Sequence, residues 1–559
     1  MRSTFMGLET AKRGMFTQQS ALHTTGHNIS NANTPGYSRQ RVNFQTTTPY
    51  PAVGLNRPSI PGQMGTGVEA GSVQRIRDGF LDVQYRNENT KLGYWSARAD
   101  AFTKVEDIVN EPTTEGLSAT MTELWKSFQD LAGASENEGA RGVVLERLQA
   151  SADTFNYMSD SLQAVKKDFG NQAGVTVNAA NSVIEKLFAV NQQISEVEPN
   201  GYLPNDLYDE RDQLIDELSQ YMNVTTSSES SGGNALPIAE GIYTISILHA
   251  DGSKTNLMDK NSYSLLSFSP SSVDAAIPPE SNRVDGLYLI GHDRTGQPAG
   301  TSTAIPFADA NGTAVFPNGE IKGLIEAYGY KGMKDTDGDG TKEEATVGIY
   351  QNMIDELDKF AYTFKTMVND IHKKGFDAEG NPGQDVFKTD AAAGNQPVYT
   401  GAASSLSLTG ITTKQVAASA VGPDGTVVNI GDGNNALNLS SIGAMLLTPG
   451  NTVDLLGTED TYTISGDLPI KTGSLNSFYE GVIGRLGVDS QQAARMEKNV
   501  DVLRSSVITN RESVSSVSLD EEMTNLIQFQ HAYNGAARMI TVVDEMLDKI
   551  INGMGVGGR

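Results

Sequence analysis

The chain has 559 residues, enough for two to four domains, and its 68 acidic against 42 basic side chains give a formal charge of -26. This surface repels phosphate backbones and argues against a nucleic-acid partner, while the absence of cysteine excludes disulfides, thiolate metal sites and cysteine nucleophiles. Without a stretch of roughly 18 apolar residues or an apolar signal-peptide core, the sequence predicts no membrane partner and a protein that is cytoplasmic or exported without a cleaved signal.

Residues 4 to about 31 are predicted to form a helix with a narrow apolar seam. The seam recurs at every seventh residue, as is typical of a helix that packs against another helix, and consists of Leu8, Met15, Leu22 and Ile29. The helix is expected to end where Asn31, Pro35 and Gly36 occur together. An extended arm rich in Pro and Gly should follow from Tyr37 to about Ala70, with a short strand near 41–44.

Helix is predicted to return near Ser72 and to dominate up to residue 222, with a break at Pro112. The longest helix is expected from Glu138 to Val197. At about 1.5 Å per residue it would be a rod on the order of 90 Å long. Another helix should begin after Pro204.

Residues 224–317 are predicted to form a β domain, since Tyr243, Ile245 and Ile247 alternate with polar residues. Asp251-Gly252 and Asp285-Gly286 suit hairpin turns. The later segments are expected to be helices at about 319–330 and 343–373, a second β-like insertion at about 376–470, and a long helix that includes 475–507.

The last helix is predicted to begin at Ser518, whose hydroxyl and Glu521 would form a capping box. It carries a second apolar seam with Gln530 and Asp544 in the skipped positions, consisting of Leu519, Met523, Leu526, Tyr533, Ala537, Ile540, Leu547 and Ile551. Each terminal seam is too narrow to form a core alone. We therefore expect the two helices to pair with each other or with copies of the same molecule.

The predicted fold class is an elongated α+β multidomain protein. Its terminal coiled coil and helical bundle are built from both chain ends, and β-rich domains are inserted between them. The predicted domains are 1–70 with 515–559 (terminal coiled coil and arm), 71–223 with 318–375 and 471–514 (helical bundle), 224–317 (β-rich), and 376–470 (β-rich).

Candidate sites for chemistry are few, and no catalytic motif or cofactor site is predicted. His23 and His27 have helical metal-ligand spacing, but no third ligand is nearby. Asp335, Asp337 and Asp339 copy the first half of a calcium-binding EF-hand loop, yet Thr346 occupies the position of the bidentate Glu. A solvated acidic turn between two helices is therefore favoured over weak calcium binding.

The terminal stretches resemble bacterial flagellar axial proteins, and among these the hook-associated proteins. The resemblance is carried by 26–40 (GHNISNANTPGYSRQ), 65–68 (GTGV), 77–81 (RDGFL), 205–214 (NDLYDERDQL), 518–523 (SLDEEM) and 530–538 (QHAYNGAAR). It implies a non-enzymatic structural subunit at the junction between hook and filament, without cofactors, exported by the flagellar type III apparatus to the extracellular flagellum.

The implied partners are the hook protein, a second junction protein, copies of the same chain in a ring, and an export chaperone at the C-terminal helix. Both terminal seams then become the assembly interface, and the C-terminal seam also the chaperone interface. The alternatives are another axial protein, such as the second junction protein or a hook subunit, an enzymatic domain grafted into the middle, or an axial protein whose inserted domains act as an adhesin. We further hypothesise that the terminal helices are largely disordered in the free monomer and fold on assembly.

Overall fold

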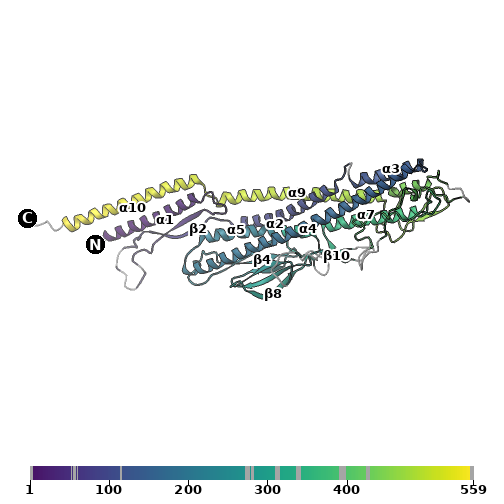
Figure 1. The fold of residues 1–559 in the computed structure, drawn as a ribbon. Helices are drawn as coiled ribbons and strands as arrows, with labels where there is room; N and C mark the ends of the chain where they lie inside the picture. The colour runs from purple at the N-terminus through teal and green to yellow at the C-terminus, as the bar shows by residue number, and fades with distance from the viewer. Residues whose placement is uncertain are drawn as a thin grey trace, which may run out of the picture.

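The computed structural model describes residues 4–51, 53–54, 58, 61–113, 116–270, 277, 282–308, 315–334, 342–389, 398–423 and 429–553. The molecule is elongated, its long helices run along its length, and both ends of the chain lie at the same tip (Figure 1). Helices from the two halves of the chain pack together and strands lie between them in sequence, which confirms the predicted α+β class.

The terminal unit consists of two helices and a two-stranded ribbon. Helix α1 (Thr4–Ser30) lies antiparallel to α10 (Leu519–Gly553) (Figure 1). Strand β1 (Gln40–Thr46) pairs antiparallel with β2 (Val68–Arg75). The helix predicted from Ser72 is wrong, because 72–75 complete β2 with Val73 opposite Val42.

The helical bundle follows directly. It contains α2 (Gly79–Val109), α3 (Leu117–Gly133), α4 (Glu138–Val197), α5 (Asn205–Tyr221), α6 (Glu320–Tyr328), α7 (Ile349–His372) and α9 (Leu475–Ser515). Helix α4 is continuous over 60 residues with the predicted bounds. Asn137 caps its start by accepting a hydrogen bond from the Gly139 amide at 2.8 Å. The apolar seam of α4, which includes Val144, Phe155 and Phe169, is buried in the bundle core.

The first insertion is an antiparallel sheet, as predicted for 224–317. Its six strands follow chain order: β3 (Val224–Glu229), β4 (Ile242–Leu248), β5 (Lys254–Met258), β6 (Ser262–Ser267), β7 (Leu287–Asp293) and β8 (Pro298–Ile305). Asp251-Gly252 connects β4 to β5, with Gly252 in the left-handed region at φ 84°. Asp285-Gly286 forms no hairpin turn. Val284, the residue before it, forms an isolated parallel β-bridge with Tyr330, and Asp285-Gly286 then leads into β7.

A short hairpin replaces part of one predicted helix. Strands β9 (Tyr330–Lys334) and β10 (Glu343–Val347) pair antiparallel, and α7 begins only after Gly348. The β-branched residues Thr346 and Val347 favour strand over helix at this point. The acidic turn of Asp335, Asp337 and Asp339 lies outside the described residues, and strands rather than helices flank it.

The segment 376–470 contains less strand than predicted. Its described residues form α8 (Asn434–Ser440), the three-residue strands β11 (Thr452–Asp454) and β12 (Thr461–Thr463), short helical turns and loops. Side chains satisfy much of the loop backbone: the Asn369 carboxamide oxygen accepts hydrogen bonds from the Val386 and Phe387 amides, each at 2.9 Å. This segment is therefore loop-rich rather than β-rich. The boundaries of the four domains stay a prediction.

Candidate assembly site at the terminal helices

Helix α1 packs through small residues rather than through the predicted seam alone. Leu8, Met15, Leu22 and Ile29 are each half-buried. The fully buried side chains of α1 are Thr17, Ala21, Thr24, Thr25 and Asn28. The Thr17 hydroxyl, for example, lies 3.0 Å from the carbonyl of Val68 in β2, so this side of the helix faces the ribbon. Small residues let α1 approach α10 and the ribbon closely at once.

Helix α10 uses a register that differs from the predicted one. Its half-buried members of the predicted seam are Leu526, Tyr533, Ala537, Ile540 and Leu547. Exposed members are Leu519, Met523 and Ile551, at 49%, 54% and 70% of their surface.

The missed members of the packed face are Glu522, Phe529 and Val543. Glu522 is 2% exposed and Val543 is 5% exposed, and Phe529 packs edge-to-face on Phe44 of β1 with 6.0 Å between ring centroids. A seam that includes these three residues does not pass through Gln530 and Asp544. The polar residues at those two positions of the predicted seam were therefore the feature of the sequence that pointed to the observed register.

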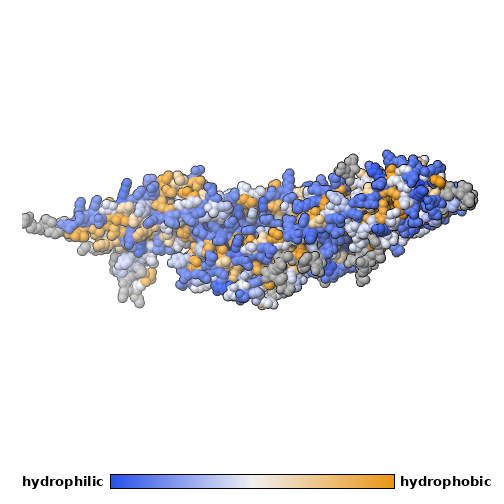
Figure 2. Space-filling model, viewed as in Figure 1, coloured by the Kyte–Doolittle hydropathy of each residue, from blue (hydrophilic) through white to orange (hydrophobic). Residues whose placement is uncertain are grey.

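The rest of α10 exposes two apolar strips. The first outer strip is Leu519, Met523 and Ile527, and the second outer strip is Met539, Val542, Met546 and Ile550; all seven side chains are exposed. At 3.6 residues per turn, the strips lie roughly 90° to either side of the face packed on α1. Hydrophobic side chains gather on the surface at this tip of the molecule (Figure 2).

A buried polar cluster joins α1, the arm and α10. The Asn28 carboxamide nitrogen donates to a Glu522 carboxylate oxygen at 3.1 Å and to the Gln40 carbonyl at 2.8 Å. Its carboxamide oxygen accepts from the Gln40 amide at 3.0 Å and from the Tyr37 hydroxyl at 2.8 Å. Arg39 Nε donates to the other Glu522 oxygen at 2.7 Å. Every member comes from a segment that carries the resemblance described above.

One sequence prediction, the capping box at Ser518, is modified at this cluster. The Ser518 hydroxyl accepts from the Glu521 amide at 3.4 Å, but the Glu521 carboxylate accepts from Arg39 at 2.6 Å instead of returning to the helix start. His27 Nδ1 lies 3.0 Å from the Tyr37 hydroxyl, in a hydrogen bond. Burial, reinforced by Asp206, raises the pKa of Tyr37, which keeps its hydroxyl protonated as a donor.

An acidic face on α5 anchors the arm to the bundle. Asp209, Asp212 and Asp216 are spaced three and four residues apart and share one side of the helix. Asp209 accepts from the Ser38 amide at 3.0 Å and pairs with Arg75 of β2 at 2.6 Å. Burial raises the pKa of Asp209.

Asp212 stands at the centre of the same network. It pairs with Arg75 at 3.0 Å, Arg77 at 3.3 Å and Arg86 at 3.2 Å. Burial opposes its ionisation, yet Arg77, Arg75 and Arg86 together lower its pKa well below the usual range. The network reaches α9 through Arg511, which pairs with Asp216. Residues 126 to 295 positions away in the sequence are thus fixed to one helix.

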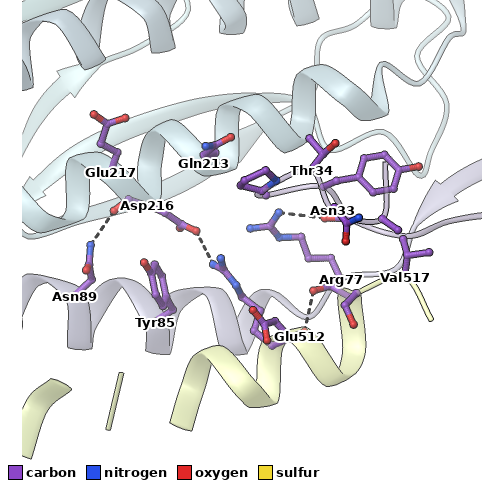
Figure 3. A pocket seen from close by; sticks show the side chains of 18 of the residues that line it. Asn33, Thr34, Arg77, Tyr85, Asn89, Gln213, Asp216, Glu217, Glu512 and Val517 are labelled. Atoms are coloured by element: carbon purple, nitrogen blue, oxygen red, sulfur yellow. Dashed lines mark hydrogen bonds and ion pairs between the residues drawn. The ribbon is translucent and has the colours of Figure 1, made fainter. Parts of the chain in front are cut away.

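A polar cleft of about 680 Å³ lies beside this network. Tyr85 and Asn89 of α2 line one wall, and Gln213, Asp216 and Glu217 of α5 line the other (Figure 3). Residues 32–38, which join α1 to the arm, also line the cleft. Four of the charged lining residues are engaged in ion pairs, which supports mechanical anchoring: Arg77, Asp216, Arg504 and Arg511.

The described residues contain neither a metal-binding cluster nor a membrane-spanning helix. Within the described ranges, no group of three His, Cys, Asp or Glu side chains is placed to hold a metal ion. None of the described helices combines the length and apolar character that a bilayer crossing requires.

The chain is similar to known families of flagellar proteins. A family described as the helical domain of flagellar hook-associated protein FlgK matches residues 102–387. Two flagellar basal body rod families match the ends of the chain, one at 8–37 and one, the FlgEFG C-terminal family, at 510–553. The last two matches coincide with α1 and α10.

Full-length relatives carry the same description. Flagellar hook-associated protein 1 of Bacillus subtilis (strain 168) is 40% identical over 100% of both chains. Its counterpart of Escherichia coli (strain K12) is 23% identical over 98% of this chain and 99% of its own. The solved flagellar hook junction protein FlgK from Burkholderia pseudomallei superposes with a TM-score of 0.54 at 14% identity, covering 78% of this chain and 100% of that one. At that identity the superposition supports the fold alone.

Proposed function

The chain belongs to the flagellar hook-associated protein 1 family and is a structural component of the flagellum, and from this premise we propose that its terminal unit anchors it between hook and filament. The observation that carries the proposal is the paired α1 and α10 with two apolar strips left open on α10. The role needs no catalysis.

The occupants of the two outer strips are neighbouring copies of this chain. The strips lie on opposite flanks of α10 and at different heights along it, so one copy cannot cover both with a two-fold contact. Two unlike surfaces per subunit generate a heterologous contact, which closes into a ring or continues as a helix. A tubular axial structure needs such a contact. The hook protein and a second junction protein would then bind at the two ends of the ring.

Before assembly the same strips would be exposed to water. An export chaperone covering α10 would keep them from associating early, and the flagellar type III apparatus would export the chain without a cleaved signal to the extracellular flagellum. One surface then serves the chaperone first and the neighbouring subunits later.

The test is a chain truncated before Leu519, expressed in a strain that lacks the full-length protein. We expect a soluble, folded middle that neither binds the chaperone nor appears at hook tips in images of purified hook-basal bodies. Normal incorporation of the truncated chain would contradict the proposal.

Point variants sharpen the test. Ile527→Asp adds a charge to the first outer strip and should abolish incorporation, because a neighbouring subunit would bury that charge unpaired. Gln528→Asp, at an exposed position next to Ile527 but outside both outer strips, should incorporate normally. Equal behaviour of the two variants would contradict the assignment of the strip.

A further inference from the structure

The exposed methionines are concentrated on α10. The sequence contains 17 methionines and no cysteine. Among the described residues, the exposed methionines are Met333, Met523, Met539 and Met546. Three of these four lie on the outer strips of α10, one on the first and two on the second. Most of the bundle methionines are buried, as Met367 exemplifies, and Met496 of α9 is half-buried.

The thioether is the only sulfur that an oxidant can attack in this chain. A peroxide transfers one oxygen atom to the methionine Sδ; its O–O bond breaks, water leaves, sulfur is oxidised and the peroxide is reduced. The product is a polar sulfoxide in place of an apolar, flexible side chain. On a bundle surface such a change has little effect, but on the outer strips it alters what a neighbouring subunit must bury.

We propose that Met523, Met539 and Met546 form an oxidation site through which a peroxide blocks α10 from joining other subunits. The inference rests on the proposed function, because the strips matter only if neighbouring copies cover them. Each strip holds at least one of the three thioethers, so oxidation affects both contacts of a subunit. The vulnerable state is the free subunit, since a neighbour on each strip shields the sulfur atoms.

The experiment uses the full-length protein treated with hydrogen peroxide. Peptide mass mapping should find sulfoxide at Met523, Met539, Met546 and Met333 before it appears at Met367. Addition of the treated protein to purified hook-basal bodies that lack it should give at least about tenfold less incorporation than the untreated protein, because burying an unpaired polar group opposes association. Methionine sulfoxide reductases, which act on the two sulfoxide epimers, should restore incorporation.

Matched variants separate the site from general oxidative damage. The triple variant M523L, M539L and M546L should incorporate equally well with and without peroxide treatment. After the same treatment, M333L should lose incorporation to the same extent as the wild type. Full incorporation of the oxidised wild type, or loss in the oxidised triple variant, would overturn the inference. Failure of the proposed function is recognised separately, because the untreated wild type would then not incorporate, and the inference would fall with it.

Discussion

Glu522 on α10 and Asn28 on α1 are joined by a 3.1 Å hydrogen bond across 494 residues of sequence. Glu522 is almost fully buried, and its second oxygen is bonded to Arg39. A carboxylate inside a helix pair is costly unless its partners are in place. The contact therefore sets the register in which the last helix meets the first.

Replacing Glu522 should weaken the terminal unit. Glu522→Gln leaves Arg39 without its buried partner, and we expect a loss of about 1–3 kcal/mol in the stability of the α1–α10 pair. The control is Glu521→Gln, which removes an exposed contact to the same arginine and should cost at most about 0.5 kcal/mol. Hydrogen exchange of α10 amides measures both, and equal effects would contradict the register role.

Asp212→Asn should destabilise the joint between arm and bundle. The change leaves Arg75, Arg77 and Arg86 without their shared carboxylate, and removal of one partner from a buried charge network typically costs about 3–5 kcal/mol. Glu210→Gln, an exposed position on the same helix, serves as control and should remain near the wild type. Urea denaturation of the full chain provides the comparison; wild-type stability of Asp212→Asn would refute the expectation.

Two buried groups on α7 should give opposite pH dependences. Burial raises the pKa of Asp358 to about 6 from 3.8, so its contribution to stability is present below the unfolded pKa and is lost as pH rises through 6. Burial lowers the pKa of His372 to about 4 from 6.5, so its contribution is present above 6.5 and is lost as pH falls through 4.

The two contributions oppose each other between pH 4 and 6.5. Between pH 4 and 6.5, the stability of Asp358→Asn should rise more steeply with pH than that of the wild type. The stability of His372→Gln should rise less steeply, and each difference should be about 3 kcal/mol across the window. Urea denaturation at the two ends of the window gives the slopes. Changes of the same sign in both variants would show that other groups dominate.

The terminal helices should exchange their amide hydrogens faster than α4 in the free monomer. Their seam residues are half-buried or exposed, whereas the α4 seam is buried in the bundle core. Limited proteolysis should accordingly cut near 40–70 and 510–520 and leave a resistant bundle. Protection of residues 5–30 and 519–551 equal to that of α4 would contradict coupled folding and assembly.

Calcium should leave the melting temperature unchanged. The acidic turn lacks the carboxylate that completes an EF-hand loop, so millimolar calcium is expected to have no effect on either the wild type or Asp337→Ala. A rise in melting temperature that disappears in the variant would establish a calcium site.

Local patterns predicted the long elements well, because periodicity depends only on neighbouring residues. Helix α4 has the predicted bounds, and its seam is the bundle core. The register of α10 was missed because two seams fit its spacing and only the polar Gln530 and Asp544 distinguish them. The ribbon near Ser72 and the hairpin at β10 were missed because their pairing partners lie elsewhere in the chain.

The anchoring network depends on distant residues and could not be predicted. The spacing of Asp209, Asp212 and Asp216 is visible in the sequence, but it is equally typical of a solvated helix face. Their partners come from β2, α2 and α9. The loops of 376–470 were missed for a similar reason, since bonds such as that from the Ala417 amide to His372 replace a regular ladder.

The antiparallel pairing of α1 with α10 means that the helix pair of the terminal unit has one helix from each end of the chain. Any chain that stops short of residue 519 carries only the first of these two helices, however well its middle folds. Fragments from interrupted synthesis or proteolysis would thus lack α10 and the two outer strips through which, under the proposed function, a subunit joins its neighbours. A chain without α10 also leaves α1 without the helix it packs against.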